Sequence, residues 1–188
     1  MPRAGLGPAA VVAAGAALAD ELGFANLTMN VLAERLGVRT PSLYKHVDGQ
    51  ADLNRRIAVL ALDDVADAIG KATQGYAGRD ALAAAARAIR AFVLQHPGRY
   101  AATIGVVPDG PDDPLIAAGL RVTDALTAVL RGYPIEPGDL DHALRTLRSL
   151  FHGFASLQAQ NGFQWSADVD ESFDWLIAFA DRGLRPPN

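Results

Sequence analysis

Hydrophobic residues along this chain recur at intervals of three and four positions, and alternating apolar and polar runs are nearly absent. The first pattern is typical of amphipathic helices, whereas half-buried strands have a period of two. We therefore expect an all-α protein of about nine helices. The predicted helices span residues 8–22, 29–36, 40–47, 50–70, 80–96, 99–107, 114–131, 138–160 and 168–182.

Residues that favour the start or the end of a helix flank the first predicted helices. Pro8 suits a first helical turn because its φ is already fixed, and Gly23 can take the left-handed conformation that follows a helix end. Thr28 is a good N-cap for the second helix, and Gly37 ends it. The third helix is expected to begin at Thr40.

Composition narrows the class of protein. Half of the 188 residues are hydrophobic, enough to bury a core in one or two small domains, and cysteine is absent. Disulfides and thiolate metal sites are therefore excluded. The alanine-rich stretch at 9–22 carries two carboxylates and differs from a signal peptide, and no apolar run is long enough to span a membrane. We expect a soluble, cytoplasmic protein.

The net charge of −4 is unevenly distributed. Residues 1–56 hold six Lys and Arg against five Asp and Glu, whereas the remaining residues hold eleven cations against sixteen anions. A surface for nucleic acid would therefore lie in the first third of the chain. The excess of a single positive charge permits DNA binding but does not establish it.

Residues 28–47 form the segment that points most clearly to a function. They predict a helix, a tight glycine turn and a second short helix, with Ala33 small enough for a close crossing and Val38 and Leu43 filling the angle. The second helix exposes donors and no carboxylate: Arg39, Thr40, Ser42, Tyr44, Lys45 and His46. Such a helix fits the major groove of DNA, which is about 12 Å wide.

Position along this short helix suggests the role of each donor. Base edges would be contacted by Arg39, Thr40, Ser42 and Lys45. Phosphates would be contacted by Tyr44 and His46, near the end of the helix. The amides at the N-terminus around Thr28 would hold another phosphate. An alternative remains open, because helical hairpins with a glycine turn also occur in proteins that never bind DNA. Tyr44 could then be a half-buried aromatic and His46 a helix cap.

Residues 9–65 resemble the DNA-binding region of the tetracycline-repressor (TetR) family of regulators. The likeness rests on the alanine-rich first helix and on the segments Leu-Thr-Met at 27–29, Leu-Ala-Glu-Arg-Leu-Gly-Val at 32–38 and Ser-Leu-Tyr-Lys-His-Val at 42–47. The resemblance implies the same division of roles along the recognition helix. One position departs from the family, which usually has lysine where this chain has Gln50. The loss of that charge implies weaker affinity, or compensation by Arg55 and Arg56.

The resemblance also implies that the rest of the chain binds an effector and forms a dimer. We therefore expect an N-terminal helix-turn-helix domain at 1–50 and a helical ligand-binding and dimerisation domain at 51–188. Residues 150–154, Leu-Phe-His-Gly-Phe, resemble a subgroup whose C-terminal domain contains a His-Gly pair.

Two wide apolar helices near the C-terminus suggest how two copies would pair. Their stripes exceed what one core-facing helix needs, and a four-helix interface between two copies would bury the excess. In the alternative, both helices are internal. The predicted dimer residues are Leu144, Phe154, Leu157, Phe173, Trp175, Leu176 and Ile177.

Polar residues among apolar neighbours are the candidates for an effector pocket, which would favour a small lipophilic compound with one or two polar groups. Each has a structural alternative: His96 precedes Pro97 and could cap a helix, and Arg148 and His152 could share a hydrogen-bond network. The predicted ligand-binding residues are Phe92, His96, Tyr100, Thr103, Leu147, Arg148, Phe151 and His152, with Gln158 as a further candidate.

Enzyme motifs are absent from the sequence. It has no His-Glu-x-x-His helix, no glycine-rich phosphate loop and no Gly-x-Ser-x-Gly elbow, so we expect neither catalysis, nor a cofactor, nor a metal. The predicted function is a ligand-responsive transcriptional repressor that binds palindromic double-stranded DNA as a homodimer, away from any membrane. A helical small-molecule-binding protein or enzyme that does not bind DNA is the alternative.

Overall fold

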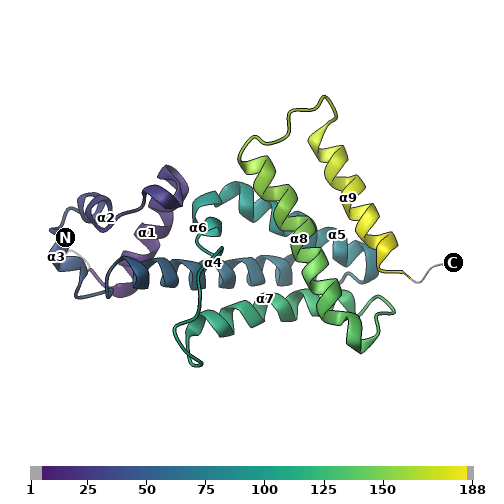
Figure 1. The fold of residues 1–188 in the computed structure, drawn as a ribbon, viewed down its shortest axis with the longest axis horizontal. Helices are drawn as coiled ribbons and strands as arrows, with labels where there is room; N and C mark the ends of the chain where they lie inside the picture. Colours follow the sequence, from purple (N-terminus) through teal and green to yellow (C-terminus); the bar gives the residue numbers. More distant parts are fainter. Residues whose placement is uncertain (1–5, 186–188) are drawn as a thin grey trace. The chain divides into compact units, whose positions relative to one another are not determined.

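The computed structural model describes residues 6–185, which form nine α-helices and two short 3₁₀ helices (Figure 1). The all-α class and the expected number of helices are confirmed. Residues 1–5 and 186–188, the outer ends of the two predicted domains, lie outside the described residues. In chain order the elements are α1 (Pro8–Leu22), η1 (Phe24–Asn26), α2 (Met29–Leu36), α3 (Thr40–Leu43), α4 (Gln50–Ala72), α5 (Gly78–Gln95), α6 (Pro97–Ala101), α7 (Pro114–Leu130), η2 (Pro137–Asp139), α8 (Leu140–Ala159) and α9 (Val169–Gly183).

The described residues form two compact units. The first unit comprises residues 6–62 and 96–118, and the second comprises residues 63–95 and 119–185. The boundary therefore falls within two helices, after Leu62 in α4 and after Ala118 in α7. Each unit has its own buried residues and is described separately below.

The first unit has a hydrophobic core to which α1, α2, α3 and the first half of α4 contribute. Leu18, Leu32 and Leu43 are almost fully buried, as are Leu53 and Ile57 of α4. These α4 residues are four apart and lie on one face of the helix, as the three-to-four spacing predicted. The core therefore holds the short helix α3 against α2 and α4.

The predicted ends of α1 and α2 are confirmed, although Gly23 has a ψ of 141° and is therefore outside the left-handed helical conformation expected for it. Gly23, with φ of 84°, follows the end of α1. The Thr28 hydroxyl accepts a hydrogen bond from the Val31 amide at 3.2 Å, and Gly37 ends α2 in the left-handed conformation. Local sequence therefore determines where these two helices begin and end.

Helices α3 and α6 are shorter than predicted. Helix α3 ends at Leu43 and not at Val47, and α6 ends at Ala101 and not at residue 107. After α6, the Thr103 hydroxyl donates to the Tyr100 carbonyl at 2.7 Å, and Gly105 has a φ of 77°. A side chain that bonds its own backbone competes with the helix, and a positive φ interrupts it.

Helix α6 packs closely on α1 because of one glycine. A Cβ atom placed on Gly98 would lie 1.8 Å from the carbonyl oxygen of Ala19, so a side chain there does not fit. Beside this contact, the Asp20 carboxylate accepts hydrogen bonds from the Arg99 amide and from Arg99 Nε, both at 2.8 Å, and lies 3.1 Å from His96 Nδ1. Backbone contact and a charged network together fix α6 on α1.

The second unit is built around α5, which packs against both α8 and α9. Its core contains Leu82, Ile89, Leu147, Phe151 and Phe173, all buried. The remaining helix ends agree with the prediction to within about two residues, the usual uncertainty of helix boundaries.

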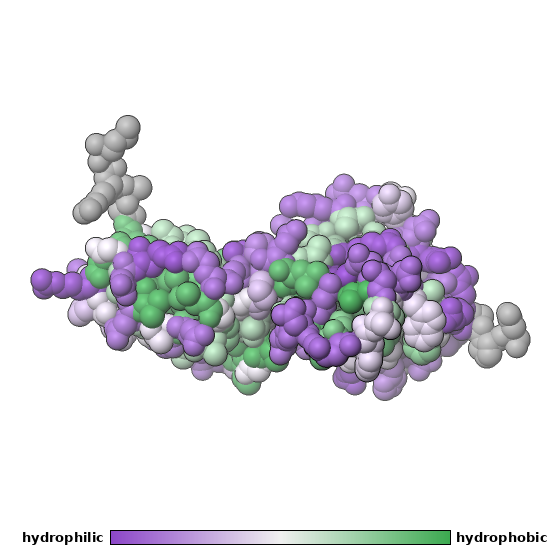
Figure 2. All heavy atoms as spheres, turned by 90° about the horizontal axis from the view of Figure 1, so that it is seen from above, coloured by the Kyte–Doolittle hydropathy of each residue, from purple (hydrophilic) through white to green (hydrophobic). Residues whose placement is uncertain are grey.

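On the face seen in Figure 2, hydrophilic residues predominate and hydrophobic patches lie between them. In the described part of the chain, no helix combines the length and the apolar character needed to cross a bilayer. Among the same residues, no group of three or more His, Asp or Glu side chains is arranged to hold a metal ion.

Candidate DNA-binding surface and ligand-binding residues

The predicted recognition segment, residues 39–46, lies on the surface of the first unit. Leu43 is fully buried under it and Val47 follows with 2% exposure, so two apolar side chains hold the segment on the core. Between them Tyr44 is 55% exposed. The segment therefore presents its polar side chains outward while its apolar side chains fix its position.

The structure places all eight predicted DNA-binding residues at or near the surface. Four are exposed and four are half-buried, and none is in the core. No carboxylate occurs between residues 39 and 47, so the segment carries only donors and positive charge. The exposed residues are Thr28, Arg39, Tyr44 and Lys45, and the half-buried residues are Thr40, Ser42, His46 and Gln50.

Three of the eight predicted DNA-binding side chains have partners within the protein, and one of them is Thr28, whose hydroxyl caps α2. The Thr40 hydroxyl donates to Asn30 Oδ1 of α2 at 2.9 Å, and the Gln50 side-chain amide donates to Asn54 Oδ1 at 2.7 Å. Sequence reasoning missed Asn30, although its position in the first turn of α2 would have allowed it to reach the start of α3.

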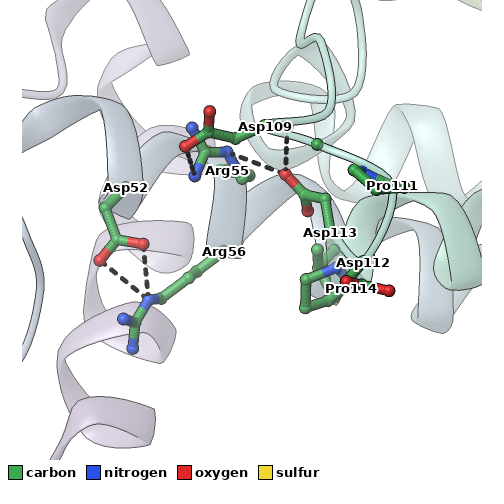
Figure 3. Close-up of a pocket in the computed structure, with 10 residues that line it drawn as sticks. Asp52, Arg55, Arg56, Asp109, Pro111, Asp112, Asp113 and Pro114 are labelled. Atoms are coloured by element: carbon green, nitrogen blue, oxygen red, sulfur yellow. Dashed lines mark hydrogen bonds and ion pairs between the residues drawn. The ribbon is translucent and has the colours of Figure 1, made fainter.

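Arg55 and Arg56, the proposed substitutes for the missing lysine, both form ion pairs with carboxylates of the first unit (Figure 3). Arg55 lies 3.4 Å from Asp109 and 3.4 Å from Asp113, and Arg56 Nε lies 2.9 Å from Asp52. Charges that are already paired contribute less to a phosphate contact, so the structure argues against compensation by these two residues.

Asp113 is a buried carboxylate that sequence reasoning did not select. It accepts hydrogen bonds from the Asp109 amide at 2.7 Å and from the Leu115 amide at 2.8 Å. These amides, together with the Arg55 charge, hold the pKa of Asp113 below its usual range. Arg55 and Asp113 therefore tie the loop before α7 to α4.

A pocket of about 590 Å³ opens beside these arginines, between α4 and the loop at 109–114. A second pocket, of about 430 Å³, lies in the second unit and is lined mainly by alanines of α5 with Tyr76, Asp80 and Arg87. No predicted ligand-binding residue is among the described residues that line these two pockets.

The predicted ligand-binding residues divide between the two units. His96, Tyr100 and Thr103 belong to the first unit, where His96 faces Asp20 of α1. In the second unit, Phe92, Leu147 and Phe151 are buried, Arg148 is exposed and His152 is half-buried.

His152 lies beside a hydroxyl group and a positive charge within α8. Its ring nitrogen Nδ1 lies 3.2 Å from the Ser156 hydroxyl. Burial lowers the pKa of His152, and the nearby Arg148 charge lowers it further. The imidazole is therefore neutral at pH 7 and can both donate and accept a hydrogen bond.

The predicted dimer residues differ in exposure. Trp175 is 64% exposed and Leu157 is 51% exposed, whereas Phe173 and Ile177 are buried within the second unit. Leu144, Phe154 and Leu176 are half-buried. Trp175 stacks on Phe179, with ring centroids 5.6 Å apart and both rings at least half exposed. The outer face of α9 therefore carries an exposed aromatic pair.

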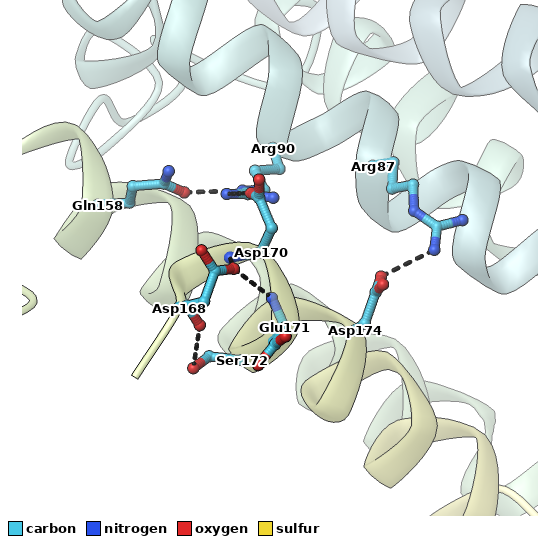
Figure 4. Close-up of polar contacts among 8 residues, drawn as sticks. All are labelled: Arg87, Arg90, Gln158, Asp168, Asp170, Glu171, Ser172 and Asp174. Atoms are coloured by element: carbon cyan, nitrogen blue, oxygen red, sulfur yellow. Dashed lines mark hydrogen bonds and ion pairs between the residues drawn. The ribbon is translucent and has the colours of Figure 1, made fainter. Parts of the chain in front are cut away.

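Arg90 of α5 holds α8 and α9 in place, a role that sequence reasoning did not find (Figure 4). Its Nε donates to Gln158 Oε1 at 2.7 Å and its Nη2 donates to Asp170 Oδ1 at 2.5 Å. The guanidinium also lies over the rings of Phe154 and Phe173, 5.8 and 4.8 Å from their centroids. Gln158, a candidate pocket residue, is thus a partner of Arg90.

The first unit therefore presents two helices joined by a glycine turn, the second of them short, exposed and free of carboxylates. This arrangement defines a helix-turn-helix protein of the DNA-binding regulator class. Residues 82–180 match the family model for "Tetracyclin repressor-like, C-terminal domain". The chain belongs to the TetR family of transcriptional regulators, and is a regulator and not an enzyme.

Two relatives extend this similarity over most of the chain. The HTH-type transcriptional regulator Rv0681 of Mycobacterium tuberculosis is 34% identical over 166 residues, which cover 88% of this chain and 75% of the relative. The HTH-type transcriptional regulator YobS of Bacillus subtilis is 31% identical over 183 residues, which cover 97% of this chain and 95% of the relative.

Solved structures share the fold. A possible TetR family transcriptional regulator from Streptomyces coelicolor A3(2) has a TM-score of 0.74 at 25% identity, covering 94% of this chain and 98% of its own. A single-residue variant of TetR from Acinetobacter baumannii AYE, in complex with minocycline, has a TM-score of 0.70 at 23% identity, covering 95% and 96%. BioQ with its double-stranded DNA operator has a TM-score of 0.66 at 21% identity, covering 95% and 99%.

Proposed function

We propose that this protein is a repressor that binds a palindromic operator as a homodimer and is released by a small, largely apolar effector. The observation that carries the DNA-binding part is the exposed segment at 39–46, which bears donors and no carboxylate on a buried apolar base. A donor-rich segment of this size that begins with a helical turn suits the major groove.

Within this proposal, each exposed donor has a role. Arg39, Ser42 and Lys45 contact base edges, and Thr40 joins them from its hydrogen bond to Asn30. Tyr44, His46 and Gln50 contact phosphates, as do the amides that follow Thr28 at the start of α2. Because Gln50 is uncharged, its contact adds no counterion release, and overall affinity depends on the remaining donors.

We propose that residues 1–50 bind DNA and that residues 51–188 bind the effector and form the dimer. The match to a repressor-like C-terminal domain over residues 82–180 supports the second assignment. We assign that domain to the subgroup with a His-Gly pair, here His152 and Gly153, which lie within α8.

The effector is proposed to be small and mostly apolar because the polar candidates are few. Phe92, Leu147 and Phe151 supply apolar surface in the second unit, and the neutral His152 supplies one adaptable hydrogen-bonding group there. Arg148 completes the candidates of this unit, with His96, Tyr100 and Thr103 as the candidates of the first. The complex of the Acinetobacter baumannii TetR variant with minocycline supports a small-molecule effector for this fold.

The dimer is proposed to form through the exposed parts of α8 and α9. Leu157 and Trp175 are the most exposed of the predicted residues, with Leu144, Phe154 and Leu176 partly accessible. Phe173 and Ile177 lie inside the second unit, so we leave them out of the interface and add Phe179. Two copies placed in this way would bury apolar surface that one chain leaves in water.

The proposed release by an effector rests on the distance between the two recognition segments of the dimer. Two recognition segments would enter successive major grooves about 34 to 36 Å apart. An effector that favours a C-terminal packing with another separation would weaken DNA binding, and a coupling of about 1 to 3 kcal/mol would change affinity roughly 5- to 150-fold.

Selection of bound fragments from random duplex DNA tests this proposal. We expect an enriched sequence with two inverted half-sites, and a complex containing two protein chains by sedimentation analysis. Enrichment of no sequence at low salt, where phosphate contacts are strongest, would refute DNA binding. A single half-site bound by one chain would refute the dimer.

A further inference from the structure

The recognition segment is too short to hold its own shape. Only Thr40–Leu43 is regular helix, and residues 44–49 continue in turns and bends. One helical turn is unstable by itself in water, because nucleation costs more than a single turn returns. Neighbouring elements must therefore determine where the exposed side chains of the segment point.

The front and the middle of the segment are held by contacts already described, the Asn30 hydrogen bond and the buried Leu43. Its far end is held by the first two turns of α4. The Asp52 carboxylate accepts a hydrogen bond from the Asp48 amide at 2.9 Å, and Arg56 Nε donates to the same carboxylate at 2.9 Å. Arg56 Nη1 also donates to the main-chain carbonyl of His46 at 3.4 Å.

These contacts act on the path of the backbone, because the groups that Asp52 and Arg56 bind at 46–48 are main-chain groups. The Asp52 side chain is 17% exposed and that of Arg56 is 41% exposed. Burial alone would raise the pKa of Asp52, but hydrogen bonds from Arg56 and the Asp48 amide lower it below its usual range. The carboxylate is therefore ionised at neutral pH, and its hydrogen bonds are charge-assisted.

We propose that Asp52 and Arg56 are positioning residues: they fix the end of the recognition segment and so determine how sharply the protein distinguishes its operator from other DNA. The inference rests on the proposed function, since it requires that residues 39–46 contact bases. A carboxylate beside a DNA-binding surface repels phosphates. Asp52 offsets that repulsion by ordering the backbone on which the base contacts depend.

Replacement of Asp52 separates these two effects because they have opposite signs. If Asp52 acted only as a negative charge, Asp52→Ala would strengthen binding to every duplex. The positioning role predicts instead that Asp52→Ala weakens operator binding by about tenfold, the loss expected for charge-assisted hydrogen bonds, while binding to a scrambled duplex is unchanged or slightly tighter. Both affinities are measured by fluorescence anisotropy at several salt concentrations.

Asp48→Ala is the matched control. It removes the same charge four residues earlier, and it keeps the main-chain amide that donates to Asp52. We expect this variant to retain the discrimination of the unmodified protein. An equal loss of discrimination in Asp48→Ala and Asp52→Ala would overturn the proposal, because Asp48→Ala keeps the hydrogen bond between the main-chain amide and the Asp52 carboxylate.

Arg56→Met tests the other half of the pair and does not depend on the fold of Asp52→Ala. Loss of discrimination with an unchanged dependence of affinity on salt supports positioning. If Arg56→Met instead reduced the salt dependence of affinity by about one phosphate contact and weakened binding to both duplexes equally, Arg56 would bind DNA directly. That result would overturn the proposal.

Hydrogen exchange of the main-chain amide at position 48 gives a readout without DNA. Exchange of this amide, corrected for the intrinsic rate of the residue at position 48, should be faster in Asp52→Ala and unchanged in Asp48→Ala, at a temperature where both variants are folded by circular dichroism. If the unmodified protein binds no DNA, the proposed function fails. If it does bind DNA and Asp52→Ala discriminates equally well, only this inference fails.

Discussion

Tyr44 shows how exposure and sequence pattern support each other at a single residue. Its side chain is 55% exposed, between the buried Leu43 and Val47. An aromatic ring that packed in the core would bury far more of its surface. This exposure argues against a core position for Tyr44 and favours a partner outside the chain.

Replacement of Tyr44 by Phe tests its proposed phosphate contact. We expect Tyr44→Phe to weaken binding to operator and scrambled DNA alike, by about 1 kcal/mol, the value of one hydrogen bond. Lys45→Ala is the comparison, since it removes a charge and should lower the salt dependence by about one phosphate contact if Lys45 also lies near the DNA backbone. A change of base preference in Tyr44→Phe with unaltered affinity would contradict the assignment.

At the scale of helices, α6 is held on α1 by close backbone contact. Gly98 allows that contact, since any Cβ would overlap the Ala19 carbonyl, and Asp20 adds hydrogen bonds to Arg99 beside it. The sequence offers no sign of this contact, because a glycine after a proline ordinarily indicates a turn. Only the packing of two helices distant in the chain explains why the position must be glycine.

Gly98→Ala is therefore expected to destabilise the first unit by about 3 kcal/mol, as overpacking at a rigid contact does. Gly70→Ala is the control. Gly70 is a helical glycine of α4 with open space around its Cβ position, so alanine there should stabilise the protein by roughly 0.5 to 1 kcal/mol. Thermal unfolding followed by circular dichroism measures both, and similar melting temperatures for the two variants would refute the contact.

The C-terminal helix α9 is fastened to the rest of the second unit by a buried polar network. The Tyr133 hydroxyl donates to Asp181 Oδ1 at 2.8 Å, and Arg185 donates to both oxygens of the same carboxylate at 3.0 and 3.2 Å. Burial alone would raise the pKa of Asp181, but the hydrogen bonds from Arg185 and Tyr133 hold it below its usual range. Burial, with Asp181 beside it, raises the pKa of Tyr133.

These shifts predict how stability varies with pH. Asp181 has a depressed pKa in the folded state, so its contribution is present above the unfolded value of about 3.9 and is lost as pH falls through the folded value. Tyr133 has a raised pKa, so its contribution is present below about pH 10 and is lost as pH rises further. Urea unfolding from about pH 3 to about pH 11, which brackets both unfolded values, measures the onset of both losses. Asp181→Asn should flatten the acid side, and a curve identical to that of the unmodified protein would exclude the network.

At the scale of the whole molecule, exposed aromatic side chains need an explanation. Trp175 and Phe179 stack on α9 while remaining 64% and 50% exposed. Exposed aromatic clusters commonly mark interaction surfaces. In this protein they coincide with helices that the amphipathic pattern had already marked as too widely apolar for one core.

Trp175→Ser combined with Phe179→Ser is expected to weaken the dimer by at least roughly 30-fold, because buried aromatic anchors contribute about 2 kcal/mol or more to an interface. The fold of each chain should survive, since neither side chain is in the core. Trp165→Ser is the control, because Trp165 is 83% exposed in the loop before α9 and lies outside the predicted interface. Sedimentation equilibrium gives the dissociation constants, and an undiminished dimer in the double variant would place the interface elsewhere.

The sequence by itself determined the all-α class, the ends of α1 and α2, and the surface position of the carboxylate-free segment at 39–46. These follow from local physics: hydrophobic period, capping side chains and glycine conformations act within a few residues. The extent of α3 and α6 could not be predicted, because the segments after Leu43 and Ala101 have helical composition but bond elsewhere.

Only the tertiary structure decided which polar residues meet. Asp20 meets Arg99, and Arg90 meets Asp170, through contacts between segments that lie far apart in the chain. It also decided that Phe173 and Ile177 are interior while Trp175 is exposed, although all three lie on one apolar helix. A helix pattern gives the direction of each side chain, but the neighbour that meets it is set by the packing of the whole chain.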